Sequence, residues 1–479
     1  MAGSVRSYPR TGTPQDVRTP LRRRTIPPEL AVLTFLAAVT RFTAITHPRA
    51  IVFDEVYFRE DALRYRDGSY FFDLHPPLGK LLLAGWAKLF GVSATAQSTD
   101  PAVVLRLLPA LAGTALVAVF YLLLRELTAS RKVATFGAAL LLLDNAILVE
   151  SRLILIDSML LLFGIGALTC YLASRRHTGA AHWILLIASA VLAGMAASTK
   201  LTGLAALGVI GLVWFAQTLR QRVSWRRALP QVAILLLVPA LLYVSVFAIQ
   251  FQLLSHSGPG DAFMSVRFQS TLVGNANYNP AASMSFLDRF IETNDAMHRY
   301  ELSLNNSHHP YSSSWLSWPI LKRPVYYWVS ATTTPGTQEY IYLQGNPVIW
   351  WGLLVGVIVV AVGWLRRPVL FQRHLGVLVL LGVAWAANFL PFVTIVRPMF
   401  LYHYFFAFMF CIAAVSIGLG LLAGWMTDGW QFPCGRSAAL YWGILAVAVA
   451  GFLFFAPISY GLPLSNGGLS ARIWLDSWR

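Results

Sequence analysis

Long apolar stretches recur along the whole chain, and they constrain its fold more than any other feature. A helix needs roughly 20 residues to cross a hydrocarbon core of about 30 Å. Only 12% of the residues are charged and 57% are hydrophobic, too little polar surface for a soluble particle of 479 residues. The sequence therefore predicts an all-α polytopic membrane protein with about eleven transmembrane helices, at residues 28 to 46, 102 to 124, 133 to 149, 153 to 173, 181 to 197, 202 to 217, 229 to 251, 346 to 364, 375 to 393, 400 to 425 and 438 to 457.

Basic residues indicate the orientation of these helices, because loops rich in Arg and Lys stay on the inner side of a membrane. They concentrate in the tail 1–27 and in every second loop, in the segments that begin at Arg125, Ser174, Leu219 and Arg366. This alternation predicts an inner N-terminus, an outer C-terminus and two long outer loops, 47–101 and 252–345. It also explains the net charge of +16 without nucleic acid as a partner. The tail is rich in Pro, Arg, Thr and Ser, which predicts disorder.

The first outer loop carries an adjacent acid pair, Asp54 and Glu55, only a few residues after the first apolar stretch. A carboxylate at this place lies close to the lipid headgroups, so it can act as a base on a substrate held in the membrane. An ordinary solvated pair of loop acids is the alternative interpretation.

The sequence lacks the patterns that indicate several other kinds of chemistry. Cys170, Cys411 and Cys434 lie in or beside the apolar stretches without CxxC spacing, which indicates neither a disulfide framework nor a zinc site. There is no Walker loop, no GxGxxG and no HExxH pattern. We therefore expect no metal and no cofactor.

Several motifs outside the acid pair point to one family. FDEVYF from Phe53 is followed in order by DLHPPLGK, LRLLPALAG, ESRLILID, STKLTGL, HSGPGDAFMSVRFQSTL, HPYSSSWLSWPI, YLQGNPVIWW and RPMFLYHY, which ends at Tyr404. In order and in placement on the loops, these segments closely resemble the protein O-mannosyltransferases. The resemblance runs from about Phe53 to about Trp474.

The resemblance implies a fold of the GT-C glycosyltransferase type with its active site on the outer face of the cell membrane. It implies transfer of mannose from a polyprenyl monophosphate to Ser or Thr hydroxyls of exported proteins. The eukaryotic members carry a β-trefoil domain in the second long outer loop, and loop 252–345 is too short for one. The chain therefore resembles the shorter bacterial, actinobacterial-like form, with one catalytic domain over 28–479 after the tail 1–27. The secretion channel is a further candidate partner.

The resemblance also implies roles for particular residues. Asp54 is the expected base, with Glu55 beside it orienting the loop or the acceptor. The expected donor-site residues, which meet the phosphate or its sugar, are Arg106, Lys200, Arg397, Tyr402 and His403. The supporting residues are His75, Glu150, Arg152 and Asp157. One base and an assisted leaving group describe a single displacement with inversion.

Each assignment has a simpler alternative. Arg106 and Lys200 could be cations that reach from the membrane to the interface. His75 fits a turn beside Pro76 and Pro77 better than an acid or a base. Arg152 with Glu150 and Asp157 favours an internal ion network. The tryptophans Trp315, Trp318, Trp350 and Trp351 are expected to be interfacial anchors.

Two other classes of function stay open at this point. Another GT-C transferase that uses a lipid-phosphate sugar would share the early acidic loop and the outer cations. A transporter would need charged residues or broken helices near the middle of the membrane, whereas the charges here gather at the ends of the apolar stretches.

Overall fold

The computed structural model describes residues 26–92, 101–305, 307–331 and 335–479. The predicted disordered tail lies almost entirely outside this part of the chain, as does 93–100 of the first long loop. The helices of the first half are α1 (Pro28–Phe42), α2 (Glu55–Asp67), α3 (Leu78–Leu89), α4 (Pro101–Thr128), α5 (Arg131–Leu142), α6 (Asn145–Arg152), α7 (Asp157–Ser174), α8 (Gly179–Thr199), α9 (Leu204–Gln221) and α10 (Trp225–Leu253). The second half contains α11 (Val266–Gln269), α12 (Phe286–Ser303), α13 (Pro347–Arg366), α14 (Pro368–Phe371), α15 (Leu375–Ala387), α16 (Phe405–Ala423), α17 (Gly435–Tyr460) and α18 (Asn466–Ser470), with strands β1 (Val325–Val329), β2 (Gln338–Leu343) and β3 (Pro463–Leu464).

The chain is a mostly helical, multi-pass membrane protein. In the described ranges, nine helical segments are long and apolar enough to span a membrane, and the bent pair α5 and α6 makes a tenth. The remaining predicted stretch, 28 to 46, holds a helix of 15 residues that ends at Phe42. The expected count of eleven is thus higher than the count of spans, because the chain leaves the helical conformation after Phe42 and Ala44 has a φ of 51°.

The predicted third span is broken where Asp144 interrupts it. Helices α5 and α6 meet at 63°. Asp144 lies between them with extended backbone, and one carboxylate oxygen accepts the N–H of Ile147, which caps α6. The other oxygen accepts the N–H of Asn346 and the indole N–H of Trp350 at the start of α13. The bend is therefore fixed by hydrogen bonds to a distant helix.

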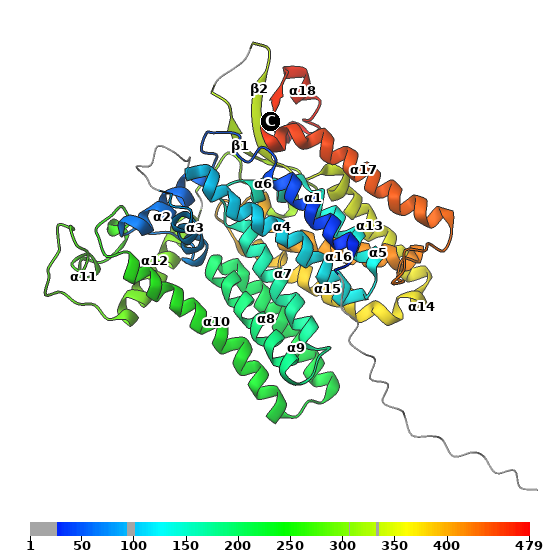
Figure 1. The fold of residues 1–479 in the computed structure, drawn as a ribbon, viewed down its shortest axis with the longest axis horizontal. Coiled ribbons are helices and arrows are strands. Elements are labelled where there is room, and N and C mark those ends of the chain that lie inside the picture. The colour runs from blue at the N-terminus through cyan, green and yellow to red at the C-terminus, as the bar shows by residue number, and fades with distance from the viewer. Residues whose placement is uncertain (1–25, 93–100, 306, 332–334) are drawn as a thin grey trace, which may run out of the picture.

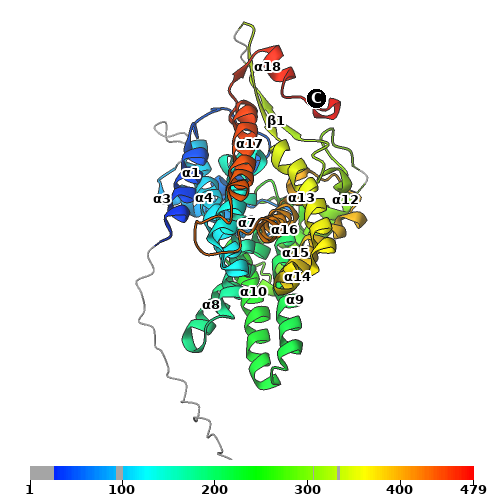
Figure 2. The ribbon, with the colours of Figure 1, turned by 90° about the vertical axis from the view of Figure 1, so that its right-hand side faces the viewer.

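The helices form an interior group and an outer group. Helices α4, α7 and α16 are mostly buried, whereas α10 and α13 expose large apolar side chains along their length, such as Leu237, Leu241, Val355 and Ile358. Exposed apolar side chains on spans of this length face lipid in a membrane. Figure 1 and Figure 2 show α16 running through the middle of the bundle, with α10 and α17 on its flanks.

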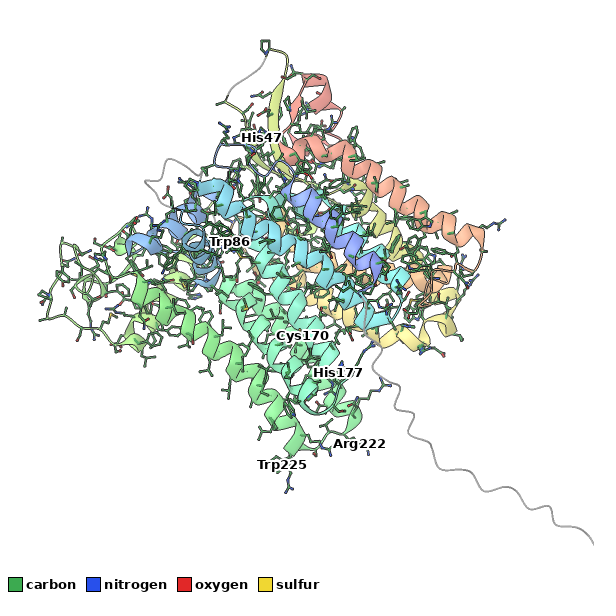
Figure 3. All side chains as sticks on the ribbon, in the orientation of Figure 1. His47, Trp86, Cys170, His177, Arg222 and Trp225 are labelled. Atoms are coloured by element: carbon green, nitrogen blue, oxygen red, sulfur yellow. The ribbon has the colours of Figure 1, made fainter. Side chains whose placement is uncertain are left out.

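The two ends of the bundle carry different loops and turns. Helices α2, α3 and α12 and the strands gather at one end in Figure 1, and the turn between α9 and α10 lies at the other. Figure 3 places His47 and Trp86 toward the first end and His177, Arg222 and Trp225 toward the second. The long loops predicted to be outside thus share one end, away from the basic turns predicted to be inside.

A small three-stranded sheet, which the all-α prediction did not include, stands at the end with the long loops. Its order is β1-β2-β3 and both pairings are antiparallel. Val325 and Tyr326 pair with Leu343 and Tyr342, and the register then shifts, so Tyr327 lies in a bulge before Trp328 pairs with Ile341. Val, Tyr and Trp residues favour strands, but a run as short as β1 next to apolar spans carries little sequence signal.

Candidate active site

A cavity of about 700 Å³ opens beneath the long-loop end of the bundle. Its polar side chains come from the first outer loop, α7, the end of α8, α12 and the segment before α16; among them are Asp54, His75, Asp157, Lys200, Glu301, His309, Asn388, Arg397, Tyr402 and His403. Its apolar wall contains Leu160, Leu161, Ala205, Phe392 and Phe406. Seven of the eleven predicted site residues therefore line one cavity.

Asp54 occupies the N-terminus of α2 without acting as a side-chain cap. Its backbone carbonyl accepts the N–H groups of Tyr57 and Phe58, and its carboxylate makes no capping bond. The carboxylate instead lines the cavity. Burial raises the pKa of Asp54 to about 6, although Lys200 nearby lowers it. The pKa of Asp54 thus lies close to the pH at which a general base works best.

Glu55, one residue further, has the opposite environment. It is fully buried, and its carboxylate forms a two-point ion pair with Arg106, with 2.7 Å from Nε to Oε1 and 2.7 Å from Nη2 to Oε2. The same carboxylate accepts the backbone N–H groups of Val52 and Ile154, each at 2.8 Å. Glu55 therefore connects the first outer loop to α4 and to the turn before α7.

Arg106 is not at the cavity. Its guanidinium also donates to the carbonyl oxygens of Pro48 at 2.6 Å and Ala50 at 2.9 Å, and its side chain is 1% exposed. These bonds hold the loop before Asp54. The structure thus brings Arg106 to Glu55 and not to the lining of the cavity.

Lys200 ends α8 and points across the cavity to the start of α7. Its ammonium group donates to both carboxylate oxygens of Asp157, at 2.9 and 2.7 Å. It also lies 5.1 Å from the ring centre of Tyr402. Asp157 and Lys200 both line the cavity. The positive charge that Lys200 brings there is therefore partly neutralised by Asp157.

A second cation, Arg397, lies in the segment before α16. Its Nε forms an ion pair with Glu301 of α12 at 2.5 Å. His403 follows, with its Nδ1 at 3.2 Å from the N–H of Phe400 and its ring stacked between Trp318 and Tyr402. The RPMFLYHY motif thus supplies one cation and two stacked rings to the cavity.

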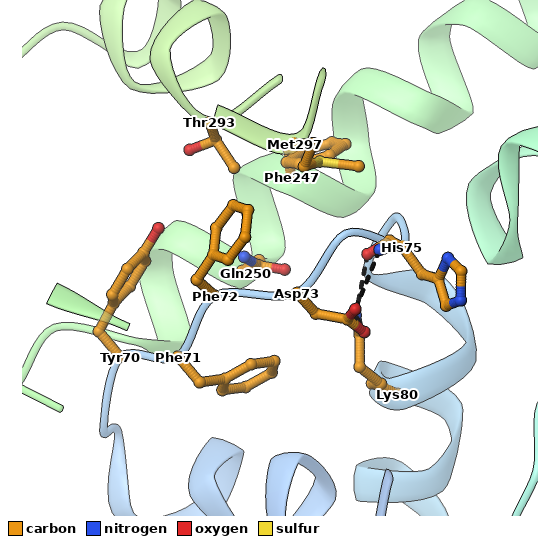
Figure 4. Close-up of a pocket in the computed structure, with 10 residues that line it drawn as sticks. All are labelled: Tyr70, Phe71, Phe72, Asp73, His75, Lys80, Phe247, Gln250, Thr293 and Met297. Atoms are coloured by element: carbon orange, nitrogen blue, oxygen red, sulfur yellow. Dashed lines mark hydrogen bonds and ion pairs between the residues drawn. The ribbon is translucent and has the colours of Figure 1, made fainter. Parts of the chain in front are cut away.

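His75 belongs to a polar cluster that adjoins the main cavity, shown in Figure 4. Asp73 accepts the N–H of His75 at 3.1 Å and pairs with Lys80, which also donates to the carbonyl of His75 at 2.9 Å. Burial lowers the pKa of His75 to about 3, so the imidazole is neutral at ordinary pH. The backbone of His75 is thus tied into this polar cluster, while His75 also lines the main cavity.

Within the described residues, the favoured ion network of Arg152, Glu150 and Asp157 does not form, because each of these side chains has other partners. Arg152 donates to the carbonyls of Arg41, Thr43 and Ala44 and stacks on Tyr460. Glu150 accepts the hydroxyl of Tyr327, and Asp157 pairs with Lys200. Arg152 is the last residue of α6, and its guanidinium is bound by carbonyls at and just after the end of α1.

Sequence reasoning missed several residues of the site. Glu301 and Tyr327 lie outside the motifs, and the structure brings Glu301 to Arg397 and Tyr327 to Phe53, the residue before Asp54. Asp73 and Lys80 are the ends of DLHPPLGK, so their spacing could have indicated a pair. Trp318 and Trp350 are 0% and 1% exposed, so the expectation of interfacial anchors is wrong for these two. Among the described residues, no group of three or more His, Cys, Asp or Glu side chains could hold a metal ion.

The fold resembles those of solved membrane proteins. The structure superposes on the S. cerevisiae protein O-mannosyltransferase Pmt1-Pmt2 complex bound to the sugar donor with a TM-score of 0.84 at 21% identity, over 94% of this chain and 92% of that one. It also superposes on the archaeal oligosaccharyltransferase AglB from Archaeoglobus fulgidus with a TM-score of 0.53 at 14% identity, over 93% of this chain and 57% of that one. The protein thus has the GT-C type of fold.

Sequence comparison gives the family. Residues 31–255 match the family described as "Dolichyl-phosphate-mannose-protein mannosyltransferase", and residues 286–478 match the "C-terminal four TMM region of protein-O-mannosyltransferase". The chain belongs to the protein O-mannosyltransferase family.

Individual relatives cover only part of the chain. Protein O-mannosyl-transferase 1 of Mus musculus is 36% identical over 268 residues, which are 51% of this chain and 36% of that protein. Protein O-mannosyltransferase 1 of Drosophila melanogaster is 34% identical over 261 residues, 50% of this chain and 30% of that protein. The matched part is thus about a third of each curated relative.

Proposed function

We propose that this protein transfers mannose from a polyprenyl monophosphate to Ser or Thr hydroxyls of exported proteins. The observation that carries the proposal is the shared cavity of Asp54, Lys200 and Arg397. A base with a pKa near 6 and two cations are the groups that a transfer from a lipid phosphate to a hydroxyl requires.

In the proposed reaction, Asp54 accepts the proton of the acceptor hydroxyl while that oxygen attacks the anomeric carbon of mannose. The bond from this carbon to the phosphate oxygen breaks, and the lipid monophosphate leaves with its electron pair. Lys200 and Arg397 stabilise the charge of the phosphate. To do so, Lys200 gives up part of its ion pair with Asp157, and Arg397 part of its ion pair with Glu301. A single displacement inverts the anomeric centre.

The apolar wall of the cavity suits the rest of the donor. Leu160, Leu161, Ala205 and Phe406 come from α7, α9 and α16, which are spans. A prenyl chain can therefore lie against these helices with its phosphate at the polar end. The description of the matching family, which names dolichyl-phosphate-mannose, supports a dolichyl or polyprenyl phosphate mannose as the donor.

The remaining expectations belong to the same proposal. The cavity opens to the outer face of the cell membrane, the N-terminus is cytoplasmic and the C-terminus is outside. The domain 28–479 is the catalytic domain of a shorter, bacterial, actinobacterial-like form, whose second long outer loop is too short for a β-trefoil insertion. The secretion channel is a further candidate partner.

The proposal is tested with purified protein in lipid nanodiscs, a radiolabelled polyprenyl-phosphate mannose and a Ser/Thr peptide. We expect mannosylated peptide whose linkage is inverted relative to the donor. The same peptide with Ala at every Ser and Thr is the control. Transfer to a lipid or a glycan, with none to the peptide, would replace the proposal with another GT-C activity.

A further inference from the structure

The residue before Asp54 is held by the second outer loop, through contacts that no motif predicted. Phe53 is not glycine, yet its φ is 49°, in the left-handed region. Such a conformation is costly for a bulky residue and persists where its surroundings fix it. The ring of Phe53 stacks on Tyr327 with 4.2 Å between ring centres and 12° between planes.

Tyr327 reaches Phe53 because of the bulge in β1. Tyr326 and Trp328 pair regularly with β2, while Tyr327 between them is the extra residue. A bulge redirects a side chain that a regular strand would place elsewhere. Tyr326 joins a different group of rings, with Tyr311, Tyr340 and Tyr342, so the neighbouring tyrosines have separate surroundings.

Glu150 fixes the other end of Tyr327. The phenol donates to Oε1 of Glu150 at 2.6 Å, and both residues are buried, at 6% and 1% exposure. Oε2 of Glu150 is buried without a hydrogen-bond partner, so this carboxyl depends on Tyr327 for its one side-chain hydrogen bond. A buried bond of this kind is costly to remove, because the polar group left behind stays out of water.

We propose that Tyr327 and Glu150 are positioning residues that set the place of the Asp54 carboxylate through Phe53. This inference rests on the proposed function and extends it to the second outer loop. Glu55 and Arg106 hold Asp54 from its C-terminal side, and Tyr327 holds it from its N-terminal side. The base is thereby fixed between two anchors before any substrate arrives, as precise proton transfer requires.

The experiment compares Tyr327→Phe, Glu150→Ala, the double variant and Glu150→Gln for peptide mannosylation. Tyr327→Phe keeps the ring but removes the hydroxyl, and we expect kcat to fall about 10- to 100-fold, since small displacements of a catalytic group have effects of this size. Glu150→Ala should match it, and the double variant should be no worse than either. Glu150→Gln keeps an acceptor oxygen and should retain most of the activity. Tyr326→Phe is the control and should act as wild type.

A second readout needs no donor. A hydrophobic carbodiimide labels protonated buried carboxyls, and mass spectrometry of labelled Asp54 against pH gives the pKa of this group. A loosened Asp54 meets more water, so in Tyr327→Phe the midpoint should move below that of wild type. If Tyr327→Phe and Glu150→Ala both keep the labelling midpoint of wild type and a normal kcat, the proposal is overturned. Wild-type protein without any mannosyl transfer would contradict the proposed function, and the labelling midpoints would still decide the role of Tyr327.

Discussion

At the scale of single residues, Asp54 and Glu55 show how environment separates two adjacent carboxylates. Glu55 has four hydrogen bonds from Arg106 and two backbone N–H groups, while Asp54 faces the cavity. The donors around Glu55 occupy its carboxylate oxygens, whereas the half-buried carboxylate of Asp54 is open to the cavity and can meet a substrate hydroxyl there. We therefore propose proton transfer for Asp54 alone and a structural role for Glu55.

The first prediction follows from that assignment. Asp54→Asn keeps the size of the side chain and removes its basic site, so turnover should fall about 10² to 10⁴-fold with normal folding. The measurement is peptide mannosylation by protein whose amount and thermal unfolding match wild type. Normal turnover in a well-folded Asp54→Asn variant would show that Asp54 is not the base.

The second prediction concerns pH. Because burial raises the pKa of Asp54 to about 6, the base is ionised above this pH and protonated below it. The rate should therefore decrease as pH falls through about 6, well above the range of an ordinary aspartate. The test is kcat against pH between about 4.5 and 8 with saturating donor. A rate that stays constant down to pH 5 would contradict a buried base.

At the scale of elements, the ion pair of Glu55 and Arg106 attaches the first outer loop to α4. Removing one partner of a buried pair leaves the other charge unpaired, which costs about 3 to 5 kcal/mol. Arg106→Met should therefore lower the thermal unfolding temperature strongly and reduce activity through loss of structure. Arg125→Met, in the same helix and paired with an exposed Asp428, is the matched control and should change little. If Arg106→Met were fully stable but bound the donor more weakly, Arg106 would again be a candidate contact of the donor phosphate.

The cation at the end of α8 carries a separate prediction. Lys200→Ala removes a charge-assisted contact to the donor phosphate, so donor affinity should fall about 10- to 100-fold, equivalent to roughly 1.5 to 3 kcal/mol. The KM for the acceptor peptide should change little. Lys88→Ala, at the exposed end of α3, is the control and should bind donor as wild type does. Equal donor affinity in both variants would favour an interfacial role for Lys200.

The sequence predicted the long spans and much of the site, because apolar length and the order of the motifs are local properties. The bend at Asp144 was missed, since it depends on Asn346 and Trp350, about two hundred residues later. The environment of Arg106 was missed for the same reason: besides Glu55, its partners are the backbone carbonyls of Pro48 and Ala50, which no sequence pattern indicates. Tyr327 was missed because a bulge, and not the alternation of the strand, directs its side chain.

At the scale of the whole molecule, the cavity lies between the two regions that match the family. Asp54, Asp157 and Lys200 come from the first, and Glu301 and Arg397 come from the second. The base and one cation thus meet the other cation only when both halves pack together.

Topology gives the last prediction, since the proposed function requires the cavity end to face outward. After replacement of Cys170, Cys411 and Cys434 by Ser, single cysteines are placed at the exposed positions Asp67, Ser283, Ser470 and Ser224. In intact cells a membrane-impermeant maleimide should label 67, 283 and 470, and 224 only after permeabilisation. Labelling of 224 in intact cells would overturn the proposed orientation.

The pairing of Lys200 with Asp157 also bears on how the protein is made. Their helices, α8 and α7, are consecutive, so both charges enter the membrane early in synthesis and can neutralise each other at once. Arg397 and Tyr402 follow much later, shortly before α16. A nascent chain that has not reached them contains the base but only half of the charged cavity. The cavity that carries the proposed function therefore gains its last polar side chains only when the second half of the chain has been made.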